Sequence, residues 1–254
     1  IGWNALSKGG RETLAICRDA LADGAKTALP VGVACAVVGI IIGTMTLTGA
    51  ANTFGQFIVA VGQDSLFLSL VLTMITCIVL GMGIPTIPNY IITSSIAAPA
   101  LLEMGVPLIA SHMFVFYFGI MADLTPPVAL AALAASSIAR DSHIRIAFTA
   151  TKVALAGYVV PFMAVYDNNL LLQSDDILGI AYVVIKALLA VLLWGGIATG
   201  WFNRRLVLWE YPLAIAGAVG LVLSTPVSDE IGFGCAALFL ALHFWRTRGQ
   251  PVAA

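Results

Sequence analysis

The chain has 254 residues, of which 60% are hydrophobic and 10% are charged, and its mean hydropathy is +1.00. Soluble domains carry roughly 25% charged residues, so this chain has too little polar surface to cover a soluble fold. Its formal net charge of −1 excludes a basic surface for nucleic acid, and its four widely spaced cysteines exclude a disulfide framework or a transition-metal site.

Residues 1–27 form the first expected element, an amphipathic helix. Leu14, Cys17 and Leu21 recur at helical spacing, with basic residues elsewhere on the surface. This pattern predicts a helix lying at the membrane interface, with a soluble linker helix as the alternative. The chain begins with Ile1 and lacks the charged start and cleavage site of a signal peptide. We therefore expect the C-terminal piece of a longer protein.

Long charge-free stretches follow, and about 20 consecutive apolar residues are typical of a transmembrane helix. The expected transport repeat, 28–166, has a span at 28–47, a polar loop "TGAANTFGQ", interrupted segments at 65–102 and 109–139, and a span at 146–166. Residues 167–254 are expected to form a C-terminal extension with helices at 177–200, 206–224 and 231–245. The sequence therefore predicts an all-α polytopic membrane protein.

Basic and acidic residues alternate between the expected ends of these spans. The basic ends carry Lys8, Arg11, Arg18, Lys26, Arg140, Arg145, Lys152, Arg204, Arg205, Arg246 and Arg248. The opposite ends carry Asp64, Glu103, Asp167, Asp175, Asp176, Asp229 and Glu230. The positive-inside rule places the basic ends and the C-terminus in the cytoplasm. Lys186 does not fit the alternation, and we expect it to snorkel toward the outer surface.

The segment 65–102 has two glycines and two prolines between Gly81 and Pro88. Each of its arms is shorter than the roughly 20 residues of a full span. Its turn is uncharged, whereas every other expected cytoplasmic turn is basic. These features favour a re-entrant hairpin with its tip inside the protein over two complete crossings.

A second break, "ADLTPPVAL", interrupts the segment 109–139. Irregular backbone at membrane depth survives where it is buried in protein or lines a polar cavity. We therefore expect the two breaks to meet at one site, as in many secondary transporters. Helix ends at the breaks present carbonyl groups that suit a small cation, and helix starts present N–H groups that suit a carboxylate. Pro126 or Pro127, like Pro88, fits the first turn of a new helix.

Polar side chains near the breaks are the candidate ligands. They are Thr86, Asn89, Thr93, Ser94, Ser95, Asp123 and Thr125. Asp123 is the acidic residue of these segments. It either coordinates an ion or takes up a proton, or else it has a structural role at a helix end. The hydroxyl groups at 93–95 either contact the site or allow close helix packing. His112 is expected to cap or pack near the outer end of its span, and His143 and His243 to lie at the interface.

The residues "GMGIPTIPNYIITSSIAAPALLEMGVPLIASHMFVFYFGIMADLTPPVALAALAASSIA" closely resemble the fused membrane subunits of tripartite ATP-independent periplasmic (TRAP) transporters, in the subfamily called TAXI. The resemblance covers about residues 20–172. It implies an elevator-type ion-transporter-like fold of two inverted repeats, with the second repeat here and the first in an upstream half. It also implies a bacterial or archaeal cytoplasmic (inner) membrane, a periplasmic solute-binding protein, and a sodium or proton gradient that drives uptake of an organic anion, commonly a carboxylate.

The resemblance also implies roles for individual residues. Ion binding falls to Gly81, Gly83, Pro85, Thr86, Asp123, Thr125 and Pro127. Substrate binding falls to Thr86, Asn89, Thr125 and Pro126. The "IPN" after Thr86 departs from the more usual alanine-rich continuation, so Asn89 either is specific to this substrate or caps the second hairpin arm. No cofactor is expected. Hydroxyl and carbonyl groups favour sodium as the coupling ion, although Asp123 allows protonation.

Three other functions compete with a binding-protein-dependent permease. A stand-alone ion-coupled carboxylate carrier has the same membrane pattern. An intramembrane enzyme needs a Ser/His pair, a paired-Asp motif or a zinc helix, and none occurs. A purely structural subunit has no need of two costly backbone breaks. The sequence also has no ATP-binding loop, which fits a gradient-driven transporter.

Overall fold

The computed structural model describes residues 9–62, 65–223 and 226–247. Within these ranges the chain is helical, and its extended backbone is limited to an isolated bridge between Trp201 and Arg205. In this described part of the chain, three helices are long and apolar enough to cross a membrane, or four if a bent pair forms one span. This confirms an all-helical protein with several apolar helices.

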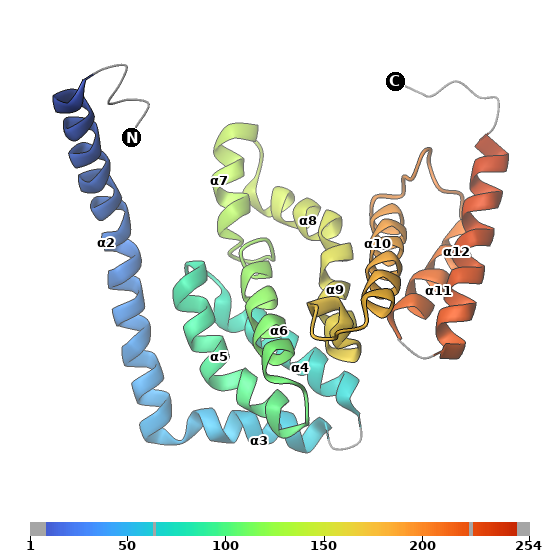
Figure 1. Ribbon diagram of the computed structural model, residues 1–254, viewed down its shortest axis with the longest axis horizontal. Helices are drawn as coiled ribbons and strands as arrows, with labels where there is room; N and C mark the ends of the chain where they lie inside the picture. Colours follow the sequence, from blue (N-terminus) through green and yellow to red (C-terminus); the bar gives the residue numbers. More distant parts are fainter. Residues whose placement is uncertain (1–8, 63–64, 224–225, 248–254) are drawn as a thin grey trace.

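The first described helix, α2 (Gly10–Thr48), stands apart from the others at one side of the molecule (Figure 1). It continues through residue 27 without interruption, although Pro30 lies inside it. At 1.5 Å per residue its 39 residues span about 58 Å, well beyond the roughly 30 Å of a hydrocarbon core. The expected interfacial arm and first span are therefore one continuous helix.

The stretch expected as a polar loop, "TGAANTFGQ", is largely helical instead. Helix α3 (Ala50–Gly62) begins there and lies across the end of the molecule, roughly perpendicular to α2 (Figure 1). Its polar residues Asn52 and Gln56 are one turn apart, so they share a face of a helix that also buries Ile58. The expectation of a loop was wrong because the polar residues form one face of an amphipathic helix.

The interrupted segment 65–102 forms two helices joined by a tight turn. Helix α4 (Leu66–Gly81) begins at Ser65, whose side chain accepts a hydrogen bond from the Leu68 backbone N–H. Helix α5 (Thr86–Glu103) follows after the hairpin turn, residues 82–85. Gly83 has a φ of +78°, which a residue with a side chain rarely adopts. The helix–break–helix pattern is confirmed, and its re-entrant placement in a membrane stays a prediction.

The second interrupted segment also forms two helices. They are α6 (Leu108–Met121) and α7 (Leu130–Ala139), separated by the helix break at 122–129. The peptide bond between Pro126 and Pro127 is cis. Neither proline lies in the first turn of α7, because Ala129 adopts a left-handed conformation with φ 45° and the helix begins only after it. Pro88, in contrast, does lie in the first turn of α5.

The segment expected as one span at 146–166 is bent. Helices α8 (His143–Val153) and α9 (Leu155–Tyr166) meet at an angle of 45° around Ala154. Helix α9 packs against α6 in a core of aromatic rings, which contains Phe114, Phe118 and Phe162. Helix α8 turns away from this core toward α7.

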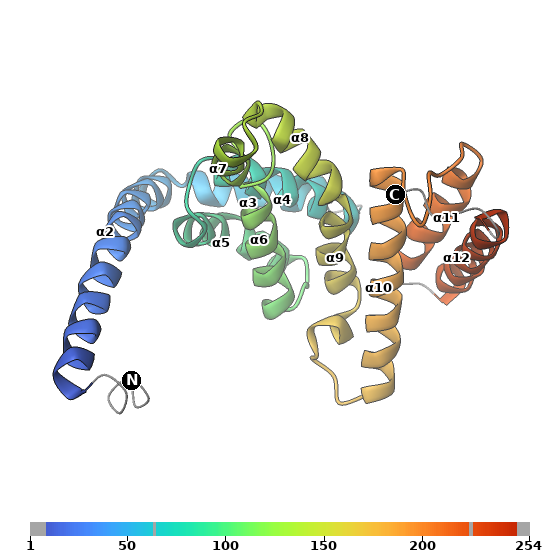
Figure 2. The ribbon, with the colours of Figure 1, turned by 90° about the horizontal axis from the view of Figure 1, so that it is seen from above.

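The C-terminal bundle consists of α10 (Ile177–Thr199), α11 (Glu210–Val222) and α12 (Pro226–Thr247), and it follows a short 3₁₀ helix η1 (Asn168–Leu171). It lies on the far side of the molecule from α2 (Figure 2). The expected span 206–224 is shorter than predicted, because residues 201–209 are not helical and α11 has only 13 residues.

Lys186 does not snorkel to the surface as expected. Its side chain is 1% exposed, and its Nζ lies 2.6 Å from Oδ1 of Asp229 on α12. The Tyr182 hydroxyl donates to the other carboxylate oxygen of Asp229 at 2.9 Å. An ion-pair partner across the bundle removes the need for this lysine to reach water.

The expected alternation of basic and acidic ends between two sides of a membrane stays a prediction. In Figure 1 the start of α2 lies at the same end as the α10–α11 link, whereas in Figure 2 it lies at the same end as the η1–α10 link. Lys8, Asp64 and Arg248 lie outside the described residues. The assignment of the basic end to the cytoplasm stays a prediction.

Candidate functional site

The two breaks meet through Asn89. This residue lies in the first turns of α5, is fully buried, and its Nδ2 donates to the backbone carbonyl oxygen of Gly119 on α6 at 2.7 Å. Thr93, one turn later, donates its hydroxyl to the Asn89 carbonyl at 2.9 Å. The hydrogen bond of Asn89 therefore ties the hairpin to the last turn of α6.

Glycines make room for the Asn89 side chain on both sides. A Cβ atom on Gly81 would lie 2.4 Å from Asn89 Nδ2 and 2.8 Å from the Cβ of Ala122. A Cβ atom on Gly119 would lie 3.2 Å from Asn89 Nδ2. Gly81 therefore allows the end of α4, the amide of Asn89 and the start of the helix break to pack together, which is a role that only glycine fills there.

Two oxygen atoms near this junction are buried and have no hydrogen-bond partner among the described residues. They are Oδ1 of Asn89 and Oδ1 of Asp123. Asp123 directly follows Ala122 in the helix break, and its own carbonyl accepts from the N–H of Ala131, which closes the break. Buried polar atoms are normally paired. Among the described residues, an amide oxygen of Asn89 and a carboxylate oxygen of Asp123 therefore have no hydrogen-bond partner.

Thr125 faces a different neighbour. Its hydroxyl shares a hydrogen bond with the Tyr158 hydroxyl on α9 and also contacts the Met121 carbonyl at 2.7 Å. Thr151 on α8 donates to the carbonyl of Leu124 at 3.1 Å. These contacts hold the helix break against the bent α8–α9 pair.

The other predicted ligands lie around the junction without joining it. Gly83 and Pro85 are exposed in the hairpin turn, Thr86 is half-buried at the start of α5, and Pro127 is exposed. Pro126 is half-buried. In the described part of the chain, no hydrogen bond connects Thr86 to the helix break. The structure therefore brings Gly81, Asn89 and the backbone before Asp123 together. The hairpin turn also approaches the helix break, since a Cβ atom on Gly83 would lie 3.4 Å from Cγ1 of Val128.

The remaining polar candidates have local partners. Ser94 and Ser95 each donate to the carbonyl oxygen of Ile91 on their own helix. His112 packs near the start of α6, where its Nδ1 shares a hydrogen bond of 2.8 Å with the Tyr90 hydroxyl, as expected of a packing role. His143 is half-buried at the start of α8.

Sequence reasoning missed a buried charge cluster at the basic end of the C-terminal bundle. Glu210 is fully buried, and its carboxylate contacts His243 Nδ1 at 3.2 Å and Arg246 Nε at 3.1 Å. It also accepts from the Val207 N–H at 2.8 Å. His243 is therefore buried inside the bundle, and its position at the membrane interface stays a prediction. The signal was present, because Glu210 is an acidic residue inside an expected span.

Sequence reasoning also missed Gly119 and Tyr158, which contact Asn89 and Thr125. Each lies in an apolar helix, and no periodic pattern distinguishes a glycine or a tyrosine that faces a site from one that only packs. Within residues 9–62, 65–223 and 226–247, no three His, Cys, Asp or Glu side chains gather as a metal-binding group.

Comparison with known families accounts for this arrangement. Residues 5–174 match the family described as "Tripartite ATP-independent periplasmic transporter, DctM component". The chain belongs to this family. It is thus a TRAP permease component, a transporter part rather than an enzyme, and the family implies a periplasmic binding protein as its partner. The predicted TRAP family is confirmed.

The match covers the helices that form the junction and ends before α10, so the C-terminal bundle lies outside it. No curated protein and no solved structure matches the chain.

Proposed function

We propose that this TRAP permease component imports organic anions, chiefly carboxylates, by binding-protein-dependent symport driven by a sodium gradient. The observation that carries the proposal is the contact of Asn89 with Gly119, which joins the two backbone breaks beside two unpaired buried oxygen atoms. Irregular backbone gathered at one buried point is how secondary transporters build their binding sites.

The start of α5 supports an anionic substrate. The N–H groups of a helix's first turn have no partner within the helix, and the helix dipole favours negative charge there. Helix α5 starts at Thr86, directly after the hairpin turn, and Pro88 lacks an N–H that would need a partner. A substrate carboxylate would therefore be bound by the first N–H groups of α5, with the Thr86 hydroxyl and Pro126 nearby in the same region.

The unpaired oxygen atoms support sodium over a proton. Asn89 Oδ1 is an amide acceptor that binds no proton in the physiological range, whereas amide, hydroxyl and carbonyl oxygen atoms are suitable ligands for sodium. Asp123 Oδ1 adds a negative charge at the helix break. We assign the ion to the region of Gly81, Gly83, Pro85, Thr86, Asp123, Thr125 and Pro127, with Asn89 at its edge.

The wider assignment follows the resemblance in the sequence. We place the chain in the TAXI subfamily, as the C-terminal part of a fused permease in a bacterial or archaeal inner membrane with its C-terminus in the cytoplasm. Residues 28–166 would be the second inverted repeat of an elevator-type fold, working together with an upstream half.

Uptake by proteoliposomes tests this proposal. The full-length permease would be reconstituted and offered labelled dicarboxylates and amino acids, with or without an inward sodium gradient and with or without its binding protein. Uptake that needs both is the expected result, and Asp123→Asn should then weaken the dependence on sodium. Uptake that follows a proton gradient alone would overturn the sodium assignment.

A stand-alone carboxylate carrier is the second candidate, because the junction itself contains nothing that requires a partner. The same experiment separates the two candidates. Rapid uptake without any binding protein would retain the site at the junction and reject the tripartite mechanism for this chain.

A further inference from the structure

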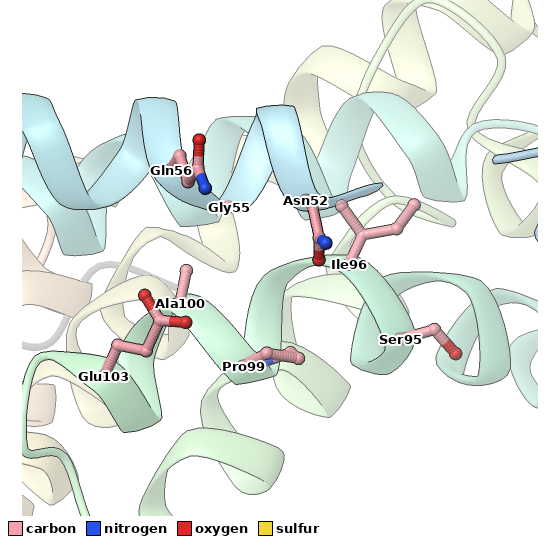
Figure 3. Close-up of a pocket in the computed structure, with 8 residues that line it drawn as sticks. All are labelled: Asn52, Gly55, Gln56, Ser95, Ile96, Pro99, Ala100 and Glu103. Atoms are coloured by element: carbon pink, nitrogen blue, oxygen red, sulfur yellow. The ribbon is translucent and has the colours of Figure 1, made fainter. Parts of the chain in front are cut away.

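A polar cleft lies between α3 and α5, away from the junction of the two breaks (Figure 3). Its volume is about 160 Å³. Its polar side chains are Asn52 and Gln56 from α3 and Ser95 and Glu103 from α5, and its floor includes Pro99 and Ala100. At about 30 Å³ per water molecule, the cleft has room for about five waters, which suits the head of one side chain.

The cleft is rich in hydrogen-bond acceptors. Ser95 donates its only hydroxyl proton to the Ile91 carbonyl at 2.7 Å, so its oxygen has no proton left for another partner. Pro99 has no N–H, so the Ser95 carbonyl lacks its usual donor one turn later. Glu103 makes no ion pair among the described residues. The cleft thus combines one carboxylate with two amide groups that can each accept through oxygen, and its negative charge favours a cation with several N–H donors.

The position of the cleft identifies the side from which such a cation arrives. Helix α3 follows the end of α2 that lies opposite the basic start of that helix (Figure 1). That end faces the periplasm in the predicted topology. Helix α5 extends from this cleft to Asn89, so one rigid helix connects the cleft to the junction.

We propose that this cleft receives a lysine or arginine side chain of the periplasmic binding protein, an inference that rests on the proposed function. The binding protein would contact α5, the second arm of the hairpin, directly. Its docking would therefore exert force on the same helix that carries Asn89. An arginine fits the acceptors best, because its planar guanidinium presents five N–H donors.

The test measures the affinity of the binding protein for the full-length permease in nanodiscs, at several salt concentrations. Glu103→Gln should weaken binding about threefold and lower its salt dependence, and Glu103→Lys should weaken it at least about tenfold through like-charge repulsion. Asn52→Ala with Gln56→Ala provides a second, uncharged disruption and should weaken binding without changing its salt dependence. A basic residue of the binding protein that is replaced by glutamate should restore binding to Glu103→Lys.

Glu230→Lys is the matched control, since Glu230 is exposed near the start of α12, which the predicted topology places on the same side of the membrane as Glu103. It should bind the partner as the wild type does. Elution of each variant as a single species in size-exclusion chromatography separates lost docking from lost folding.

The outcomes distinguish this inference from the proposed function. Partner-dependent uptake by the wild type together with unchanged partner affinity in Glu103→Lys and in the double alanine variant overturns the inference alone. A change of sodium dependence at constant partner affinity also overturns it, since the cleft would then hold an ion. Absence of any partner binding by the wild type overturns the inference and the tripartite mechanism together.

Discussion

The side-chain amide of Asn89 and the backbone carbonyl of Gly119 form a 2.7 Å hydrogen bond across 30 residues of sequence. This bond connects the hairpin to the helix that precedes the second break. Any movement of the Asn89 side chain away from α6 breaks this bond. A side chain in place of the hydrogen atom of Gly81 or Gly119 would press on the Asn89 amide. The relative position of the two breaks therefore depends on one amide group.

Replacement of Asn89 by alanine should separate the breaks. The change removes a buried hydrogen bond and its donor, which typically costs about 1–3 kcal/mol in stability. If the same free energy is lost from the geometry of the site, uptake should fall about 5- to 140-fold, because each 1.4 kcal/mol is a factor of ten. The measurements are thermal melting in detergent and initial uptake rate. Asn203→Ala, at an exposed position in the α10–α11 link, is the control and should leave both unchanged.

Gly81→Ala should impair transport although alanine favours helices. Its Cβ would clash with the Asn89 amide at 2.4 Å and with Ala122 at 2.8 Å, so the end of α4 has to move. Gly234→Ala on α12 meets no atom within 4 Å and should be neutral or stabilising by up to about 1 kcal/mol. Uptake and melting temperature of the two variants make the comparison. Equal behaviour of both variants would show that the close packing at Gly81 has no functional role.

The shared hydrogen bond of Thr125 and Tyr158 should appear as an energetic coupling. Interhelical hydrogen bonds in membrane proteins are worth about 0.6 kcal/mol on average, so Thr125→Val and Tyr158→Phe should be less than additive by about that amount. A double-mutant cycle on stability measures it. Strict additivity would mean that the two hydroxyl groups contribute independently.

Loss of the Lys186 charge should destabilise the C-terminal bundle. Lys186→Met leaves Asp229 largely buried without its cation, and breaking such a pair costs about 3–5 kcal/mol. Lys186→Met combined with Asp229→Asn should recover much of this loss, because no unpaired charge then remains. Melting temperatures of the single and double variants test this. A single variant as stable as the wild type would contradict the ion pair's structural role.

Much of the fold follows from local sequence. The glycines and prolines between Gly81 and Pro88 locate the hairpin turn, and "LTPP" locates the second break, because both are consequences of local backbone restrictions. Hydropathy locates α10, because its run of apolar residues is also a property of the local sequence.

Partners across the fold do not follow from local sequence. The burial of Lys186 depends on Asp229, which lies 43 residues later on another helix. The bend at Ala154 and the contact of Tyr158 with Thr125 likewise arise from the way α8 and α9 pack on other helices. At the site, Asn89 was identified but its partner Gly119 was not, because a backbone carbonyl carries no sequence signature.

The C-terminal bundle contacts the rest of the described chain chiefly through α10 on α9, with smaller contacts to α8 and η1. Helix α9 in turn is bonded to the second break through Tyr158. If the binding site moves across the membrane during transport, α9 has to move with it. The C-terminal bundle, which packs on α9, would then move as part of the same rigid body. The extra helices would then enlarge the moving mass and its lipid-facing perimeter, so the turnover rate of this permease should respond to bilayer thickness and viscosity.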